Sequence, residues 1–339
     1  MRQRTGRTPR TGREGDDPGA KGHPAGSTGP VPVPIPASAP VPVPVPPAPV
    51  EQVAGYRILE PLGRGSMGAV YRAVQVSLDR VVAIKILFPH LAHNPAFARR
   101  FEREALAAAR LNHPNIIGAL DVGEENGIRY LVMEFIEGDS VAQMLAAGPM
   151  DEHRAVGIVT QVARALDHAH RSEIVHRDIK PANIMVTKEG VAKLCDLGLA
   201  KEITADGSGT EEGLSMGTPF YVSPEQARGE RRIDIRTDLY ALGATLYHMV
   251  TGRVPFPGPN PAVIMTRHLN DPLEPPDEVN PRVSRGLCQI IERMMAKARE
   301  ARYQSPAELL QDLQAWMEGR LVVHQAIQIR SRRRFRRFR

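Results

Sequence analysis

A glycine-rich segment between two strand-like segments constrains the fold of this chain more than any other feature. Gly63–Val70 has the pattern G-x-G-x-x-G-x-V, and such glycines let a backbone approach phosphates where a Cβ would obstruct. Tyr56–Leu59 before it and Ala69–Val74 after it are typical of strands. A dinucleotide-binding loop of similar pattern opens a helix instead. The flanking strands therefore favour a phosphate-binding hairpin, with a plain hairpin turn as the alternative while the loop is considered alone.

The eighty residues from Tyr56 to Phe135 predict a small α+β lobe. A third strand is expected over Val81–Leu87. Asn94 and Pro95 supply an N-cap followed by proline at the first helical position, which begins a helix that ends near residue 111. Two more strand-like runs follow, at Ile117–Val122 and Ile128–Phe135.

Lys85, on the third strand, has two interpretations. It could be a solvent-facing residue in the period-2 alternation of the strand. However, Glu104 lies on the apolar stripe of the predicted helix with Phe97, Phe101 and Ala108. A carboxylate there needs a partner, because burying it unpaired is costly. We expect Lys85 to be that partner, in a pair that holds the ammonium over nucleotide phosphates.

After Gly138 the pattern becomes helical. Apolar residues recur at helical spacing over Asp151–Arg171, which predicts an amphipathic helix. Thr237–Val250 is apolar on all sides and predicts a buried helix. A capping box at Ser305 begins a last helix that ends near Met317.

The strongest chemical signal is the run H-R-D-I-K-P-A-N at residues 176–183, followed by D-L-G at 196–198. Asp178, Asn183 and Asp196 supply a candidate base and two oxygen ligands for Mg²⁺, which prefers such oxygens. Any one of the three could simply cap a turn, the commonest use of Asp and Asn. The whole set, in order with the glycine loop and Lys85, is not explained by turns.

These motifs resemble those of protein kinases, specifically the bacterial eukaryotic-like (Hanks-type) serine/threonine protein kinases. The similarity extends from Tyr56 to Met317 and includes the segments His113–Ile116 and Gly217–Gln226. The resemblance implies an α+β, bilobal protein-kinase fold with a β-rich N-lobe that has one main helix, and a larger, mainly helical C-lobe. It implies a kinase domain over 56–318, with the N-lobe at 56–135 and the C-lobe at 138–318.

The resemblance also implies the activity, transfer of the γ-phosphate of Mg·ATP to Ser/Thr hydroxyls of protein substrates, and a set of site residues. Asp178 would accept or orient the substrate hydroxyl proton, and Lys180 would steady the γ-phosphate. Asn183 and Asp196 would hold Mg²⁺, while Met133 would lie at the back of the adenine pocket. The implied ATP-binding residues are Leu62, Gly63, Arg64, Gly65, Ser66, Met67, Gly68, Ala69, Val70, Lys85, Glu104, Met133, Glu134, Ile136 and Asp196.

Two braces are implied by the resemblance as well. Glu225 would pair with Arg302 to brace the substrate loop, and Asp238 would tie down the backbone of the catalytic loop. Two departures from the family pattern, D-L-G for D-F-G and S-P-E for A-P-E, change no charged or metal-binding group. Cys195 could be a reactive thiol beside Asp196, but a small buried hydrophobe is the simpler interpretation.

Arg177, just before the candidate base, indicates regulation by phosphorylation. An arginine there can receive a phosphate from the activation segment, residues 196–225, and order it. The candidate acceptors are Thr204, Ser208, Thr210 and Ser215, with Thr210 and Ser215 preferred by position, through trans-autophosphorylation and hence self-association. Two rival functions stay open: a pseudokinase, meaning a binding module on a kinase scaffold, and a small-molecule kinase. The peptide-binding pattern of residues 217–225 argues against the second.

The net charge of +6 belongs to the two ends of the chain. Residues 1–50 carry +3 and residues 330–339 carry +7, so the 279 residues between them carry −4. The first segment holds 13 of the 30 prolines and predicts a disordered basic arm that serves as a spacer, with an SH3-type ligand as the alternative. The Arg-rich C-terminal tail over 319–339 could bind anionic lipid or nucleic acid, or be a solvated tail.

Two cysteines, Cys195 and Cys288, exclude a disulfide-rich scaffold and a structural zinc cluster. A bridge between them does not follow from the sequence, and a reducing compartment is the simpler interpretation. The chain contains no run of about 18 apolar residues, and Pro and Gly follow the basic N-terminus where a signal peptide needs an apolar stretch. We therefore expect a soluble, cytoplasmic chain that the tail could hold at a membrane surface.

Overall fold

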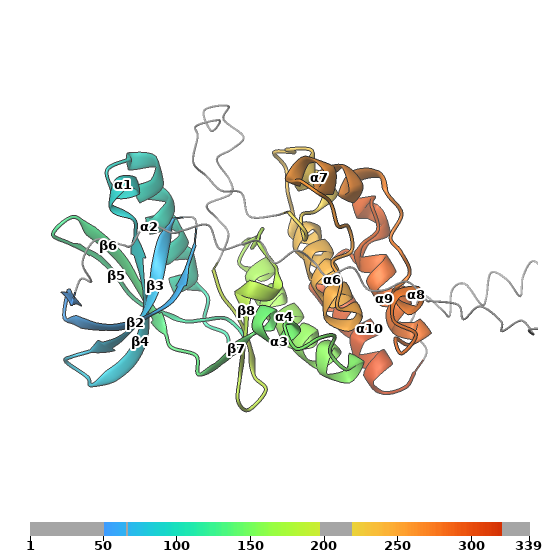
Figure 1. Cartoon of the computed structure of the whole chain (residues 1–339), viewed down its shortest axis with the longest axis horizontal. Helices are drawn as coiled ribbons and strands as arrows, with labels where there is room; N and C mark the ends of the chain where they lie inside the picture. Colours follow the sequence, from blue (N-terminus) through green and yellow to red (C-terminus); the bar gives the residue numbers. More distant parts are fainter. Residues whose placement is uncertain (1–50, 66, 197–218, 321–339) are drawn as a thin grey trace, which may run out of the picture. The chain divides into compact units, whose positions relative to one another are not determined.

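The structure, a computed structural model, describes residues 51–65, 67–196 and 219–320. Its first part is an antiparallel six-stranded sheet with strand order β1-β2-β3-β4-β6-β5, and helices α1 and α2 lie against it (Figure 1). A second sheet has the order β7-β8-β9. The strands are β1 Gln52–Val53, β2 Tyr56–Arg64, β3 Gly68–Gln75, β4 Arg80–Leu87, β5 Ala119–Glu125, β6 Ile128–Glu134, β7 Gly138–Ser140, β8 Ile184–Thr187 and β9 Ala192–Leu194.

The remaining elements are helical. The α-helices are α1 Pro89–Ala92, α2 Pro95–Arg110, α3 Val141–Leu145, α4 Glu152–Arg171, α5 Pro224–Ala227, α6 Ile235–Thr251, α7 Pro261–Asn270, α8 Pro276–Val279, α9 Arg285–Met294 and α10 Pro306–Met317, and 3-10 turns cover Pro181–Asn183 and Arg299–Ala301.

The six-stranded sheet carries apolar side chains on both faces, as the period-2 pattern of β4 predicts. On one face Val82, Ile84 and Val132 pack together. On the other face Leu87 and Leu131 pack against α2. Packing against the sheet therefore fixes the position of α2, and Glu104 of α2 lies beside Lys85 of β4.

The sequence predicts most of this lobe correctly. All five predicted strands and the predicted helix are present, with ends that differ by a few residues. The short strand β1 pairs with β2 before the first predicted strand; two residues are too few to show a period. The strand expected from Ile117 begins at Ala119 instead, because the amide of Ile117 donates to the carbonyl of Leu194 at 2.9 Å.

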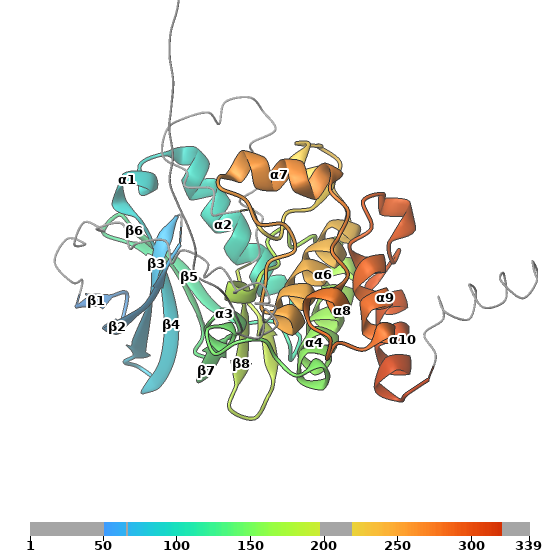
Figure 2. The ribbon, with the colours of Figure 1, turned by 45° about the vertical axis from the view of Figure 1, so that its right-hand side comes forward.

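The helices of the second lobe pack around α6. Helices α4, α6, α9 and α10 lie side by side (Figure 2), and nearly every residue of α6 is buried, as its apolar sequence predicts. Gly252 ends α6 in a left-handed conformation with φ of +70°, which glycine adopts without the steric cost of a Cβ. The predicted helices over 151–171 and from Ser305 are present as α4 and α10.

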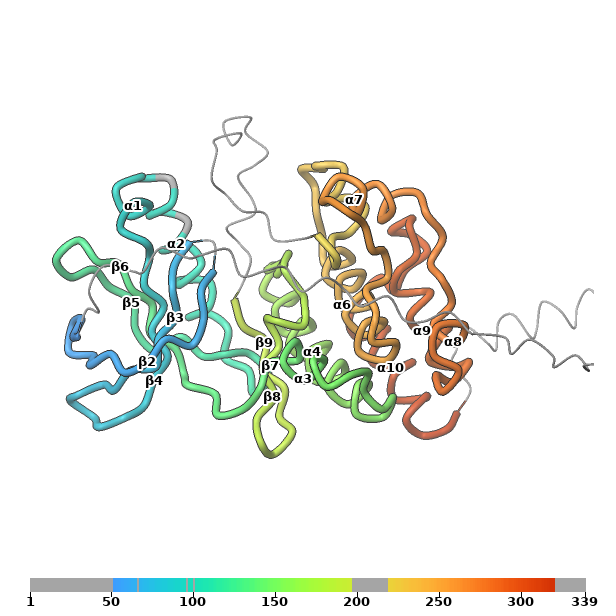
Figure 3. The backbone as a smooth tube through the Cα atoms, viewed as in Figure 1, coloured from blue at the N-terminus to red at the C-terminus, as the bar shows by residue number. Residues whose placement is uncertain are grey.

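The small sheet connects this helical core to the candidate site. Strands β8 and β9 pack on α3 and α4 (Figure 3). Asn183 immediately precedes β8, and Asp196 follows β9 by two residues. The sheet thus brings together two candidate ligands that are thirteen residues apart in sequence.

The α+β bilobal fold expected from the sequence is confirmed. The Pro-rich arm over 1–50, Ser66, the candidate phosphorylation sites in 197–218 and the tail from residue 321 lie outside the described residues. Within the described part of the chain, no helix has both the length and the apolarity needed to cross a membrane.

Candidate active site

Three charged side chains meet beside the sheet. Nζ of Lys85 lies 2.9 Å from Oδ1 of Asp196 and 3.6 Å from Oε2 of Glu104. Lys85 and Glu104 are both buried, at 9% and 7% exposure. The predicted Lys85–Glu104 pair is therefore present, but the shorter contact of the ammonium is with Asp196.

The electrostatics of this cluster follow from the geometry. Burial acts to lower the pKa of Lys85, but the carboxylates of Asp196 and Glu104 outweigh it and raise that pKa. The ammonium in turn lowers the pKa of Asp196. Burial raises the pKa of Glu104, against the opposing effect of Lys85. Lys85 therefore remains cationic and Asp196 anionic at neutral pH, as phosphate and metal binding require.

The glycine-rich loop connects β2 and β3 through only three residues. The amide of Gly65 donates to the carbonyl of Gly68 at 2.8 Å. A Cβ at Gly68 would lie 2.2 Å from the carbonyl oxygen of Ile86, so only glycine fits against β4. A Cβ at Gly63 would meet no atom of the described residues within 4 Å.

Two other loop residues are anchored to the lobe. Met67 is buried among Leu87, Phe101 and Leu131. The guanidinium of Arg64 lies 4.6 Å from the ring centre of Phe88, a cation–π distance. Leu62 belongs to β2 and is 46% exposed, and Ala69 and Val70 belong to β3 and are half-buried.

The catalytic loop places Asp178 between two polar side chains. Nζ of Lys180 lies 2.7 Å from Oδ2 of Asp178, and Nδ2 of Asn183 donates to the same oxygen at 3.0 Å. Asn183 also donates to the Asp178 carbonyl at 2.8 Å. These contacts fix the position of the Asp178 carboxylate. The side chain is still 20% exposed, and a group that contacts a substrate must be accessible.

Asp238 of α6 ties this loop down, as the sequence analysis expects. Its two carboxylate oxygens accept hydrogen bonds from the amides of His176 and Arg177, each at 2.7 Å. Arg177 has a φ of +67° and Asp196 a φ of +53°. Non-glycine residues at such angles cost of order 1–3 kcal/mol each, and they concentrate at functional sites because the surroundings impose them.

The donor set fits a magnesium ion. The amide of Cys195 donates to the Asn183 carbonyl at 2.9 Å, which holds the two candidate ligands side by side. Because Nδ2 of Asn183 already serves Asp178, its Oδ1 is the atom left for a metal. Among the described residues no group of three or more His, Cys, Asp and Glu could hold a metal ion alone. One amide oxygen and one carboxylate suit Mg²⁺, which keeps waters and substrate phosphates among its other ligands.

A small pocket with a cavity volume of about 20 Å³ adjoins the charged cluster, and its lining includes Lys85, Glu104, Met133, Cys195 and Asp196. Met133 is thus near the predicted nucleotide position. Both cysteines of the chain are free, and burial raises the pKa of the Cys195 thiol. The inert interpretation of Cys195 fits this environment.

The predicted adenine-binding segment is held by an ion pair that the sequence analysis did not foresee. Lys193 of β9 lies 2.8 Å from Oε1 of Glu134, and that carboxylate also accepts the amide of Gly118 at 2.9 Å. The side chain of Glu134 is therefore engaged in structure, and its amide also donates to the carbonyl of Gly118, at 3.0 Å. Ile136 is buried, and the nucleotide contacts of Glu134 and Ile136 stay predictions.

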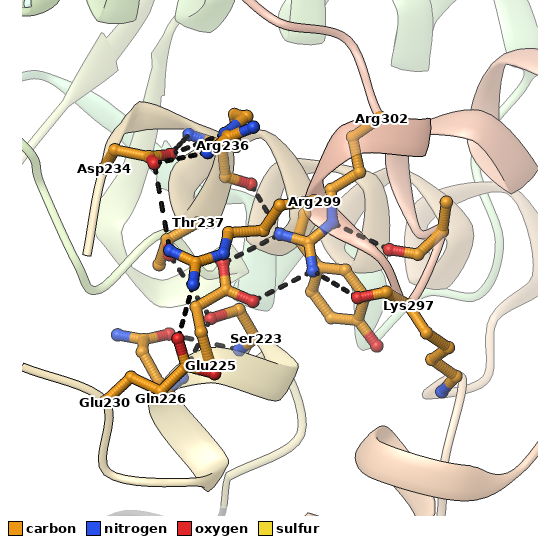
Figure 4. Close-up of polar contacts among 12 residues, drawn as sticks. Ser223, Glu225, Gln226, Glu230, Asp234, Arg236, Thr237, Lys297, Arg299 and Arg302 are labelled. Atoms are coloured by element: carbon orange, nitrogen blue, oxygen red, sulfur yellow. Dashed lines mark hydrogen bonds and ion pairs between the residues drawn. The ribbon is translucent and has the colours of Figure 1, made fainter. Parts of the chain in front are cut away.

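The predicted brace, an ion pair between Glu225 and Arg302, is present with two hydrogen bonds. Figure 4 shows the guanidinium of Arg302 facing the carboxylate of Glu225, with two hydrogen bonds of 2.8 and 2.9 Å. The two side chains are 0% and 1% exposed. Thr237 donates to the same carboxylate at 2.6 Å. The departure S-P-E also has a structural role, because Ser223 forms a capping box with Gln226 at the start of α5.

Comparison with known proteins agrees with this geometry. Residues 56–314 match the family model described as protein kinase domain, and the chain belongs to the protein kinase family. It is 41% identical over 260 residues to a probable serine/threonine-protein kinase of Clostridium perfringens, covering 76% of this chain and 38% of the relative. It is 39% identical to serine/threonine-protein kinase PknB of Mycobacterium leprae, covering 76% and 42%. The chain thus spans about two fifths of the length of these relatives.

Solved structures give the same assignment. The crystal structure of the Mycobacterium tuberculosis PknI kinase domain with the C20A substitution has a TM-score of 0.61 and 30% identity, and the match covers 77% of this chain and 95% of that one.

Proposed function

We propose that this chain is an ATP-dependent serine/threonine protein kinase that transfers the γ-phosphate of Mg·ATP to Ser and Thr hydroxyls of proteins. The observation that carries the proposal is the arrangement around Asp178. Lys180 and Asn183 hold the partly exposed Asp178 carboxylate. The carbonyl of Asn183 accepts a hydrogen bond from the amide of Cys195, the residue before Asp196. The carboxylate of Asp196 in turn contacts Lys85. Base, metal ligands and phosphate-binding cation thus lie in one continuous network.

The reaction needs alignment and charge neutralisation more than covalent help from the protein. Bound Mg·ATP supplies the phosphoryl group. Lys85 contributes a fixed positive charge to the phosphates, and Asn183 and Asp196 supply metal-binding oxygens. The Asp178 carboxylate accepts a hydrogen bond from the acceptor hydroxyl and orients its oxygen for attack. Lys180, 2.7 Å from that carboxylate, places a cation where charge on the transferred group develops.

Incubation of the purified chain with Mg²⁺, labelled ATP and a degenerate peptide library tests this proposal. We expect label on Ser and Thr peptides, none on Tyr peptides, and none with Asp178→Asn. A chain that binds ATP but transfers no label is the pseudokinase alternative, and label on small-molecule alcohols but not on peptides is the small-molecule alternative. Either result would remove the proposal.

We further propose that the chain phosphorylates its own activation segment in trans, which requires that two copies meet. The supporting observation is Arg177, which lies directly before Asp178 in the fixed catalytic loop. The acceptors Thr204, Ser208, Thr210 and Ser215 lie outside the described residues. Mass spectrometry after incubation with Mg·ATP should find phosphate within 204–215, and Asp178→Asn mixed with active enzyme should gain it. Absence of phosphate there in the active enzyme contradicts this proposal.

The Arg-rich tail and the cytoplasmic location stay predictions. Seven arginines within residues 330–339 would attract a phosphate-rich surface, which could hold the enzyme at a membrane. Sedimentation with anionic vesicles at low and high salt, with and without residues 330–339, measures this. Equal sedimentation of both chains would exclude a lipid role, and the same comparison with nucleic acid separates the two ligands.

A further inference from the structure

Gln226 makes a contact that neither the proposed catalytic roles nor the Glu225–Arg302 brace explains. Its side-chain amide uses both ends. Oε1 accepts the amide of Ser223 at 3.1 Å within the capping box of α5. Nε2 donates to the backbone carbonyl of Arg177 at 2.9 Å, across 49 residues of sequence.

The carbonyl that Gln226 contacts is part of the peptide unit that leads into Asp178. The same peptide unit contains the amide of Asp178, which donates to Nδ1 of His176 at 3.3 Å. The peptide plane between Arg177 and Asp178 is therefore held at both edges. Because a peptide unit rotates as a rigid plane, a turn of this plane would break both hydrogen bonds together.

This peptide follows an unfavourable backbone conformation. Arg177 has a φ of +67°, and a non-glycine residue keeps such an angle only where its surroundings impose it. Its amide is fixed by Asp238 of α6 at 2.7 Å, and its carbonyl is fixed by Gln226 of α5. Two elements thus hold the two polar backbone atoms of the residue directly before the base.

The backbone around Gln226 is fixed by its neighbours in α5. Its neighbours Ser223 and Glu225 are 0% and 1% exposed, and Glu225 is locked to Arg302 by two hydrogen bonds. Figure 4 shows Ser223, Glu225 and Gln226 together at the start of α5. Movement of α5, which begins at the end of the activation segment, would therefore act on the catalytic loop through the hydrogen bond from Gln226 to Arg177.

We propose that Gln226 is a positioning residue that couples the end of the activation segment to the catalytic base, by fixing the Arg177–Asp178 peptide plane. The inference deepens the proposed kinase function and rests on it. It also explains why a glutamine suits this position. Glutamate would complete the capping box equally well, but its carboxylate has no N–H to donate to the Arg177 carbonyl.

Gln226→Glu in the full chain is the decisive variant, since it keeps size and cap but removes the donor. Gln304→Glu is the matched control. The Nε2 of Gln304 also donates to backbone carbonyls, those of Arg299 and Arg302 among them, at an exposed position outside the catalytic loop. Ser223→Ala is a second control, because it removes the hydroxyl of the cap and leaves the amide donor of Gln226 in place.

We expect Gln226→Glu to lower kcat roughly tenfold, the effect of one misplaced hydrogen bond, with KM for ATP unchanged. Amide hydrogen exchange in a peptide covering residues 174–184 should become faster. Gln304→Glu should change neither quantity, and Ser223→Ala should reduce kcat less than Gln226→Glu. A merely structural role would instead lower the thermal midpoint while kcat per nucleotide-binding site stayed constant.

Two results would overturn the inference. One is wild-type exchange in residues 174–184 of Gln226→Glu, which needs no activity and therefore tests the positioning even if the proposed kinase function fails. The other is an active wild-type enzyme with an unchanged kcat in Gln226→Glu. Absence of transfer by the wild-type chain contradicts the proposed function, and the exchange measurement then decides the positioning alone.

Discussion

Nζ of Lys85 donates to Oδ1 of Asp196 at 2.9 Å, although the two residues are 111 positions apart in the chain. This contact joins strand β4 of the sheet lobe to the segment that follows β9. It is shorter than the contact of the same ammonium with Glu104, 3.6 Å. The cation that would meet the phosphates is therefore held by the same carboxylate that would hold the metal.

Lys85→Met should abolish phosphoryl transfer. Methionine keeps the volume of the side chain but removes the charge, which leaves Glu104 and Asp196 without their cation. We expect transfer at background level and a folded protein, measured by labelled-phosphate transfer and circular dichroism. Lys188→Met is the matched control, because Lys188 is 68% exposed and pairs with Glu137 at the surface. Full activity in purified, folded Lys85→Met would refute the assignment.

Removing Arg302 should destabilise the helical lobe. Arg302→Met leaves the buried carboxylate of Glu225 without its cation, which costs roughly 3–5 kcal/mol of unfolding free energy. Replacing both Arg302 and Glu225 by Met also removes the unpaired carboxylate, so the double variant should lose less unfolding free energy than Arg302→Met. Urea unfolding of the three proteins measures this. A double variant as unstable as Arg302→Met would show that the carbonyl contacts of Arg302 dominate.

Acid should destabilise the fold through His248. Burial lowers the pKa of this imidazole to about 4, and Nδ1 of the ring lies 2.7 Å from the hydroxyl of Tyr221. A depressed folded-state pKa stabilises the fold above the unfolded value near 6.5, and this stability is lost as pH falls toward 4. Between pH 7.5 and 5 the loss amounts to about 2 kcal/mol.

His248→Gln isolates that contribution. Glutamine does not titrate and can still pair with Tyr221, so its loss of unfolding free energy between pH 7.5 and 5 should be about 2 kcal/mol smaller. His268, whose pKa burial lowers to about 3, remains in both proteins and cancels in the comparison. The same acid sensitivity in both proteins would contradict this account.

Cys195 should react slowly with thiol reagents. Burial raises its pKa, and the thiolate is the reactive species; burial also raises the pKa of Cys288 to about 12. Titration with a chromogenic disulfide reagent should find no fast thiol in the native protein and two after denaturation. A fast-reacting thiol that disappears in Cys195→Ala would restore the reactive interpretation.

The sequence predicts those features that depend on local chemistry. The strands follow from alternation, α10 from its cap at Ser305, and the Lys85–Glu104 pair from a carboxylate on an apolar helix face. The predicted elements do not include helix α9, although Leu287, Ile290, Ile291 and Met294 recur at helical spacing after Ser284, which caps it. That signal was available in the sequence.

Other features depend on pairing between distant elements, for which a single sequence carries no signal. Lys193 in Ala-Lys-Leu looks like a solvent-facing strand residue, and only the neighbouring position of Glu134 gives it a partner. Gln226 looks like an ordinary capping-box residue until the fold brings Arg177 beside it. The Lys85–Asp196 contact likewise appears only when β4 and β9 are placed together.

The central claim is that Asp178 serves as the base of a serine/threonine kinase. The most direct measurement is single-turnover transfer from labelled Mg·ATP to a Ser/Thr peptide by the wild-type chain and by Asp178→Asn, with nucleotide binding measured in parallel. The account predicts rapid transfer by the wild type, loss of transfer in the variant, and similar nucleotide affinity in both. Equal transfer rates in the two proteins would contradict it.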